Sequence, residues 1–144
     1  MRTDTERACD WLEENGHGAV ERCVPCAGGD TCDSFELALV SGTRLFLKTH
    51  VAPPAGLFAA EAAGLTELRR SATVRVPAVI HADPSFLLLE FIDRGEPGAA
   101  FWRTLGRALA RLHGTPAPCF GFLMDNWCGT TPQPNPRTTD GHAF

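Results

Sequence analysis

The chain has no long apolar segment. No stretch of its 144 residues approaches the ~20 consecutive apolar residues that a membrane-spanning helix needs. It also lacks internal repeats and low-complexity tracts, which excludes repeat architectures and biased linkers. Its first residues, MRTDTERACDWLEENG, are acidic and interrupted by charges, unlike a secretory signal peptide. We therefore expect a cytoplasmic protein with no membrane partner.

The chain also lacks an excess of positive charge. Its net charge of −4 argues against a polyanionic partner, so we expect no nucleic-acid binding. A small phosphate site stays open, because such a site needs only one cation and a few backbone N–H groups. With 44% hydrophobic and 21% charged residues, a chain of this length suits one globular domain.

The six cysteines lack the arrangement of a zinc or redox site. Cys23-Val-Pro-Cys26 is a single CxxC pair, whereas a structural zinc site takes four ligands, commonly from a second CxxC or an HxxxH. A thioredoxin-like pair would lie at a helix start, and this one lies in a predicted strand. We expect free thiols and no metal site, with Cys32 as the most reactive thiol because it adjoins a glycine turn. A zinc or redox module stays open as a further alternative.

Hydrophobic periodicity and turn residues predict an α+β fold. A small sheet with one helix inserted comes first, and a linker, a second long helix and a loop follow. Segment 120–135, FGFLMDNWCGTTPQPN, mixes aromatic, amide and carboxylate side chains with glycines and prolines, so we expect an irregular loop that shapes a site. The predicted helices are 3–15, 57–70 and 99–114, and the predicted strands are 19–27, 34–40, 43–50, 76–83 and 85–92.

Glu61 is the most informative residue of this pattern, because it lies inside the apolar stripe of the helix predicted over 57–70. A carboxylate on a buried face needs a cation or strong hydrogen-bond donors. Lys48, at the end of an apolar strand, is a candidate partner. The pattern also permits a plainer interpretation, in which Glu61 sits at the edge of the stripe and Lys48 extends into water.

The order of these features matches the nucleotide-binding half of the protein-kinase plan. A glycine turn is followed by a strand, a strand lysine, a helix glutamate, a buried strand and a linker, and in kinases the lysine–glutamate pair holds the α- and β-phosphates of ATP. The turn itself, GGDTCD at 28–33, matches neither GxxxxGK[ST] nor GxGxxG. By itself it is also consistent with an ordinary hairpin turn.

Several segments together resemble the fructosamine kinase (ketosamine kinase) family, from about residue 28 to residue 135. They are GGD, LFLKTH, FAAEAAGLTELRRSATVRVPAVI, FLLLEFI, LGRALARLHG, and FG with DNWCGTTPQPN. The most specific piece is DN…G.TPQPN, and LFLK…AEA.GL…L…VRVP is the next. The resemblance implies ATP-dependent phosphorylation of the sugar moiety of ketosamines, the adducts of sugars with amines. This is a deglycation repair chemistry.

The resemblance also implies a division of the chain and a set of site residues. Residues 1–92 would form a kinase-like small lobe, 93–98 a linker, and 99–144 the start of a large lobe. Lys48 and Glu61 would position the phosphates of ATP. Gly28, Gly29, Asp30 and Thr31 would cover the nucleotide, Glu90, Phe91 and Ile92 would present backbone groups to adenine, and Asp125, Asn126, Gln133 and Asn135 would lie on the substrate side.

The chain departs from the family pattern near its C-terminal end. The tryptophan-rich WxxDWxxFF segment of the family is matched only in part by PRTTDGHAF, where Pro136 and Gly141 replace the tryptophans. The HGDLWxGN segment of the family, which implies the catalytic aspartate and Mg²⁺ ligands, does not occur in the 144 residues. We therefore expect no phosphoryl transfer by this chain alone. The alternative is a non-catalytic kinase-like lobe that binds nucleotide weakly or not at all.

The helix predicted over 99–114 carries an apolar stripe that needs a partner surface. By the resemblance, this stripe would pack mainly within the large lobe, which 144 residues are too few to build. We therefore expect a loosely held segment after residue 97 and self-association through exposed apolar surface. The stripe consists of Phe101, Leu105, Ala108, Leu109 and Leu112.

Overall fold

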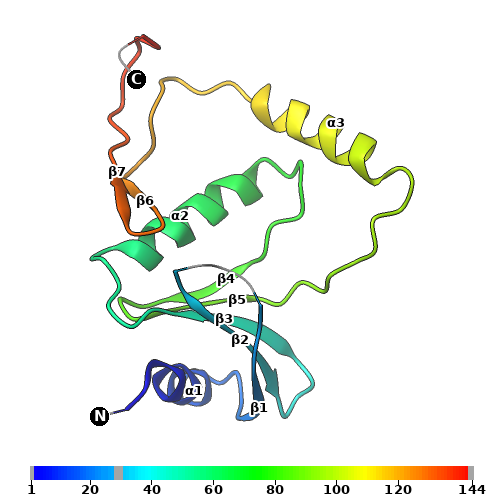
Figure 1. The fold of residues 1–144 in the computed structure, drawn as a ribbon, viewed down its shortest axis with the longest axis vertical. Helices are drawn as coiled ribbons and strands as arrows, with labels where there is room; N and C mark the ends of the chain where they lie inside the picture. The colour runs from blue at the N-terminus through cyan, green and yellow to red at the C-terminus, as the bar shows by residue number, and fades with distance from the viewer. Residues whose placement is uncertain (1, 28–30, 143–144) are drawn as a thin grey trace.

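A five-stranded antiparallel sheet forms the centre of the protein (Figure 1). The structure is a computed structural model, and it describes residues 2–27 and 31–142. The strand order is β1-β2-β3-β5-β4, and every neighbouring pair is antiparallel. With its helices, this sheet confirms the predicted α+β class. The strands are β1 (Val20–Pro25), β2 (Asp33–Leu39), β3 (Arg44–Thr49), β4 (Val79–Ala82) and β5 (Phe86–Glu90).

Helix α1 (Asp4–Glu14) covers one face of the sheet. It begins with a capping box, in which the Thr3 hydroxyl accepts a hydrogen bond from the Glu6 N–H and the Glu6 carboxylate accepts one from the Thr3 N–H. Its Ala8 and Leu12 are fully buried against apolar side chains of β2, β3 and β5. The predicted N-terminal helix is therefore confirmed, and it closes one of two cores.

Helix α2 (Leu57–Arg70) covers the opposite face (Figure 1). Its Phe58 is buried against Leu87 and Leu89 of β5, whereas Leu88 between them faces the α1 side. Because successive strand residues point to opposite faces, β5 is apolar on both sides and contributes to both cores. The prediction of a buried, continuously apolar strand here is confirmed.

The edge strand β1 also follows the prediction. It pairs only with β2, and Pro25, which has no N–H to donate, lies at its end. Strands β4 and β5 are shorter than the predicted strands 76–83 and 85–92. Residues 76–78 and 91–92 continue the chain without joining the ladder, so β4 keeps four residues and β5 keeps five.

Most of segment 120–135 is irregular, as predicted, but the prediction did not include a short hairpin. The segment contains a hairpin of β6 (Asn126–Cys128) and β7 (Thr131–Gln133). Gly129 takes φ +61° at the first position of its two-residue turn, as a type II′ hairpin requires. Pro132 pairs opposite Trp127, a position where a two-stranded ribbon does not need its N–H. The glycine and proline residues therefore shape the hairpin instead of preventing it.

Helix α3 (Phe101–His113) lies beyond α2, away from the sheet (Figure 1). Of its predicted stripe only Ala108 is buried, whereas Phe101 is 43% and Leu109 39% exposed. Trp102 beside them is 73% exposed. A hollow of about 550 Å³ separates the stripe from residues 73–75. The helix forms as predicted, but within the described residues its apolar face is largely uncovered.

We propose that this face drives self-association of the chain. Sedimentation velocity over a range of concentrations should show dimers or larger species for the wild type. The double variant Phe101→Ser/Leu109→Glu should shift the chain toward monomer, because it removes the apolar contact. Val51→Glu is the matched control, since Val51 is 94% exposed in the loop after β3 and should not alter the distribution. A wild type that stays monomeric at every concentration would contradict the proposal.

Candidate functional site

Lys48 and Glu61 form an ion pair between the sheet and α2. The Nζ of Lys48 donates to both oxygens of the Glu61 carboxylate, at 2.6 and 2.7 Å. The two side chains are only 22% and 30% exposed. Strand parity explains the contact, because Leu47 points toward α1 and Lys48 therefore points toward α2. The predicted contact is confirmed, and the plainer interpretation with Lys48 extended into water is wrong.

Lys48 is the only lysine among the 13 lysine and arginine residues of the chain. The other ion pairs to described residues use arginine, as at Arg44 and Glu36 or Arg75 and Glu90. An ammonium is a compact point charge that can serve a carboxylate and a phosphate together, whereas the planar guanidinium favours paired, side-on contacts. The use of lysine at this one position is consistent with a phosphate-positioning role.

The predicted nucleotide turn is described only in part. Gly28, Gly29 and Asp30 lie outside the described residues, and Thr31 begins the second described segment. A Cβ added to Gly129, in the β6–β7 turn, would lie 3.3 Å from the Cγ2 of Thr31. The hairpin turn therefore lies close to Thr31, in the described part of the predicted nucleotide turn.

Phe91 and Ile92 line a pocket of about 350 Å³ beside the start of the linker. Its further walls come from Cys26 and Ala27, which directly follow β1, and from Phe46 of β3. Arg94 spans the pocket wall, since its Nη2 donates to the carbonyl of Ala27 at 3.1 Å. The pocket lies between the segment before the glycine turn and the linker, where the prediction places adenine.

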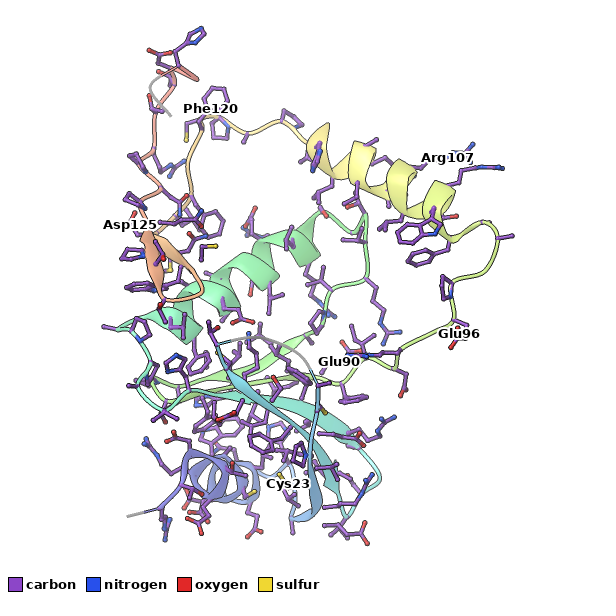
Figure 2. The ribbon with its side chains drawn as sticks, viewed as in Figure 1. Cys23, Glu90, Glu96, Arg107, Phe120 and Asp125 are labelled. Carbon is purple, nitrogen blue, oxygen red and sulfur yellow. The ribbon has the colours of Figure 1, made fainter. Side chains whose placement is uncertain are left out.

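Glu90 (labelled in Figure 2) is not among the residues that line this pocket. Its backbone and carboxylate groups make hydrogen bonds to neighbouring residues of the lobe instead. Its backbone N–H donates to the carbonyl of Ala78, and its carboxylate accepts from the Ala78 N–H at 3.0 Å and from Arg75 at 2.9 Å. The Ala78 hydrogen bond, followed by that of Arg75, holds the pKa of Glu90 below its ordinary value of 4.5. Glu90 therefore anchors the segment before β4, and its assignment to adenine stays a prediction.

The predicted substrate-side residues gather at the hairpin. Asp125 (labelled in Figure 2) accepts a hydrogen bond from the Asn135 N–H at 2.8 Å, and the Asn135 amide donates to the Gln133 carbonyl at 3.2 Å. These bonds close the base of the hairpin, whereas Gln133 is exposed. The Oδ1 of Asn126 is buried without a partner among the described residues. Their assignment to the substrate side stays a prediction.

One H-x-D tripeptide, His81-Ala82-Asp83, occurs at the end of β4, but structural contacts occupy it. The ring of His81 stacks on Trp11 at 4.0 Å between centroids. Asp83 accepts hydrogen bonds from the backbone N–H and the hydroxyl of Ser85. It therefore does not supply the aspartate of a kinase catalytic loop.

Residues 2–27 and 31–142 contain no group of three or more His, Cys, Asp or Glu residues placed to hold a metal ion. Within the same ranges, no helix is long and apolar enough to cross a membrane. All six cysteines are free thiols. Burial is the main cause that raises the pKa of Cys9 and of Cys23. The thiol of Cys23 adds to the effect at Cys9, and the thiol of Cys26 adds to it at Cys23. The reactivity of Cys32, which packs against the α2 core, stays a prediction.

A comparison of this sequence with known protein families agrees with the order and geometry of these features. The sequence model of the fructosamine kinase family matches residues 5–144. The chain belongs to this family. A probable ketoamine kinase of Enterococcus faecium is 39% identical over 127 residues, which cover 85% of this chain and 44% of the relative. A chloroplastic protein-ribulosamine 3-kinase of Arabidopsis thaliana is 29% identical, covering 94% of this chain and 43% of the relative.

Solved structures share the fold of this fructosamine kinase chain. A protein of Thermobifida fusca, described as a candidate fructosamine-3-kinase, matches with a TM-score of 0.78 and 30% identity. The match covers 91% of this chain and 46% of that one. It supports the predicted kinase-like small lobe with its antiparallel sheet. The chain spans less than half of the length of each of these relatives.

Sequence reasoning missed three contacts of this fructosamine kinase chain. They are the packing of β6 along α2, the approach of Gly129 to Thr31, and the bond from Arg94 to Ala27. The hairpin that makes the first two has a readable signal, because a Gly-Thr pair between short polar-aromatic runs is typical of a type II′ hairpin. The surface on which this hairpin packs leaves no local pattern. The Arg94 contact has none, since a side chain reaching across 67 residues leaves no local pattern.

The Glu90 network predicts a specific pH dependence of stability. The pKa of Glu90 is lowered in the folded state, so its stabilisation is complete above about pH 4.5 and is lost as the pH falls through the folded-state value. Urea unfolding measured between about pH 7 and pH 3 should show this loss. Glu90→Gln should make the free energy of unfolding less dependent on pH in this range. Glu96→Gln, in the exposed linker, should leave the pH dependence unchanged. Equal slopes for wild type and Glu90→Gln would refute the assignment.

Proposed function

We propose that this chain forms the nucleotide-binding part of an ATP-dependent ketosamine kinase. The observation that carries the proposal is the Lys48–Glu61 contact at 2.6 Å in a chain of the fructosamine kinase family. In kinases such a pair holds the lysine ammonium against the α- and β-phosphates. The reaction is phosphorylation of the sugar moiety of ketosamines, a step that permits deglycation of amines. The names of the Enterococcus and Arabidopsis relatives support this substrate class.

The nucleotide would lie along the α2 face of the lobe. Lys48 would meet its phosphates, and Glu61 would keep the ammonium in place. Phe91 and Ile92 would border the adenine ring, since their pocket of about 350 Å³ is within the usual range for ligand sites. Thr31 would lie beside the phosphates, together with Gly28, Gly29 and Asp30 of the same turn.

Mg²⁺ would neutralise charge on the phosphates during transfer. The described residues fit this ion poorly, because they offer no group of three or more His, Cys, Asp or Glu residues as a metal site. We propose that the ligands and the catalytic aspartate belong to the part of the kinase that the relatives have and this chain does not span. Asn126 is the best-placed substrate-side residue here, because its buried Oδ1 lies at the same pocket as Glu61.

A second candidate function is a kinase-like lobe that does not transfer phosphate. The absence of a metal-binding group among the described residues favours it for these 144 residues alone. Free thiols at all six cysteines are consistent with a reducing compartment, and we propose the cytoplasm as the site of action of either form.

We expect no phosphoryl transfer by the purified chain. Kinase catalysis depends on positioned Mg²⁺ and on an aspartate that orients the acceptor hydroxyl. Radiolabelled ATP, Mg²⁺ and a fructosylated amine should yield no phosphorylated sugar. Transfer by the wild type that disappears in Lys48→Met would show that the chain is catalytically complete.

Nucleotide binding tests the central role of Lys48. Isothermal titration with an ATP analogue should detect binding to the wild type. Lys48→Met should weaken it roughly 10- to 100-fold, because a charge-assisted contact is worth about 1.5–3 kcal/mol. Arg107→Met is the matched control, since Arg107 is exposed on α3 and points away from the lobe (Figure 2). Binding that is equal in wild type and Lys48→Met would contradict the assignment.

A further inference from the structure

The β6–β7 hairpin lies against α2, on the side that carries Glu61 (Figure 1). Its Asn126 and Trp127 share a pocket of about 300 Å³ with residues along the helix from Leu57 to Leu68. Those helix residues include Leu57, Ala60 and Glu61 itself. The hairpin begins more than fifty positions after the end of the helix, and it is nevertheless part of the surroundings of the ion pair.

The same hairpin reaches the nucleotide turn with its tip. Gly129 takes φ +61°, and a Cβ placed there would meet the Cγ2 of Thr31 at 3.3 Å. The hairpin therefore lies close to both elements that carry parts of the proposed phosphate site, the helix with Glu61 and the segment that begins at Thr31. No other pair of strands among the described residues lies outside the main sheet.

Helix α2 needs such support at the end where Glu61 lies. Its N-cap is Gly56 at φ +81°, and no side chain accepts a hydrogen bond from the first helical N–H groups. Missing caps leave a helix start weakly held, so its direction depends on packing. Phe58 anchors the helix to the sheet on one side, and the hairpin flanks it on another.

The hairpin is itself braced at its base. Asp125 accepts a hydrogen bond from the Asn135 N–H, and the Asn135 amide donates to the Gln133 carbonyl. Beyond the base, the backbone of Phe120 exchanges hydrogen bonds with Thr138 at 2.8 and 3.3 Å. These bonds join the two arms of the segment, so that β6 and β7 act on α2 as one unit.

We propose that the β6–β7 hairpin is a positioning element of the phosphate site, with Trp127 as its main positioning residue. Trp127 holds the start of α2 so that Glu61 stays on Lys48, and the turn at Gly129 holds Thr31 beside them. The effect on nucleotide binding rests on the proposed function. The effect on the Lys48–Glu61 contact does not.

A zero-length carbodiimide crosslink tests the contact directly. The reagent activates a carboxylate, and the Lys48 amine then attacks it to form an amide with loss of the urea by-product. Such a bond forms between groups in contact, and Lys48 supplies the only side-chain amine of the chain. Mass spectrometry after trypsin digestion gives the yield of the Lys48–Glu61 product. Trp127→Ala should lower this yield roughly 3- to 10-fold, and Trp127→Phe should restore most of it.

Matched variants keep the test decisive. Trp102→Ala removes a tryptophan that is 73% exposed on α3 and should leave the yield unchanged. Asp125→Ala opens the base of the hairpin without changing a side chain at α2, and it should also lower the yield. Circular dichroism verifies that each variant is folded. Wild-type yield in folded Trp127→Ala or in folded Asp125→Ala overturns the proposal.

A double-mutant cycle on affinity for an ATP analogue separates positioning from general packing. Trp127→Ala should weaken binding roughly 3- to 10-fold in the wild-type background and have little further effect in Glu61→Gln. Equal losses in both backgrounds overturn the positioning role. A wild type that binds no nucleotide contradicts the proposed function instead, and in that case the crosslink yield alone decides whether the hairpin positions Glu61.

Discussion

The ion pair between Lys48 and Glu61 is the contact on which the arrangement of the lobe depends. Both groups are mostly removed from water, and a buried charge without its partner is strongly destabilising. Sheet and helix must therefore be placed so that one strand residue meets one helix residue. The alternation of β3 meets this constraint, because Leu47 enters the α1 core while Lys48 emerges beneath α2. Phe58 fixes the helix above β5.

The remaining elements either cover the opposite face of the sheet or surround the ion pair and the neighbouring pocket. Helix α1 and its core cover the face of the sheet opposite to the pair. The linker and the end of β1 form the pocket beside Phe91, and Arg94 joins them. The hairpin approaches from the opposite side and reaches Thr31. The proposed functional groups thus come from one face of the sheet, and α1 covers the other face.

Most of this architecture could be predicted from the sequence, because periodicity is a local property. The bounds of α2 and the pairing of β2 with β3 followed from apolar spacing and turn residues. The Lys48–Glu61 contact is one of two arrangements that the apolar stripe permits, and the resemblance to a kinase family favours it over the plainer one. The hairpin at 126–133 is harder to predict, because glycine and proline usually interrupt regular elements, whereas here they suit its turn and its ladder. The position of Trp127 against α2 depends on tertiary packing, which no local pattern records.

The strand order has a consequence for how the chain acquires its structure. Every neighbouring pair in the sheet is formed by consecutive strands, except that β3 pairs with β5 while β4 takes the edge. Most contacts of the sheet therefore join segments close in sequence, and such topologies fold quickly. A ribosome delivers residues in order, so the sheet and both covering helices can assemble as soon as Glu90 has emerged. The lobe can then serve as a finished template for the segments synthesised after it.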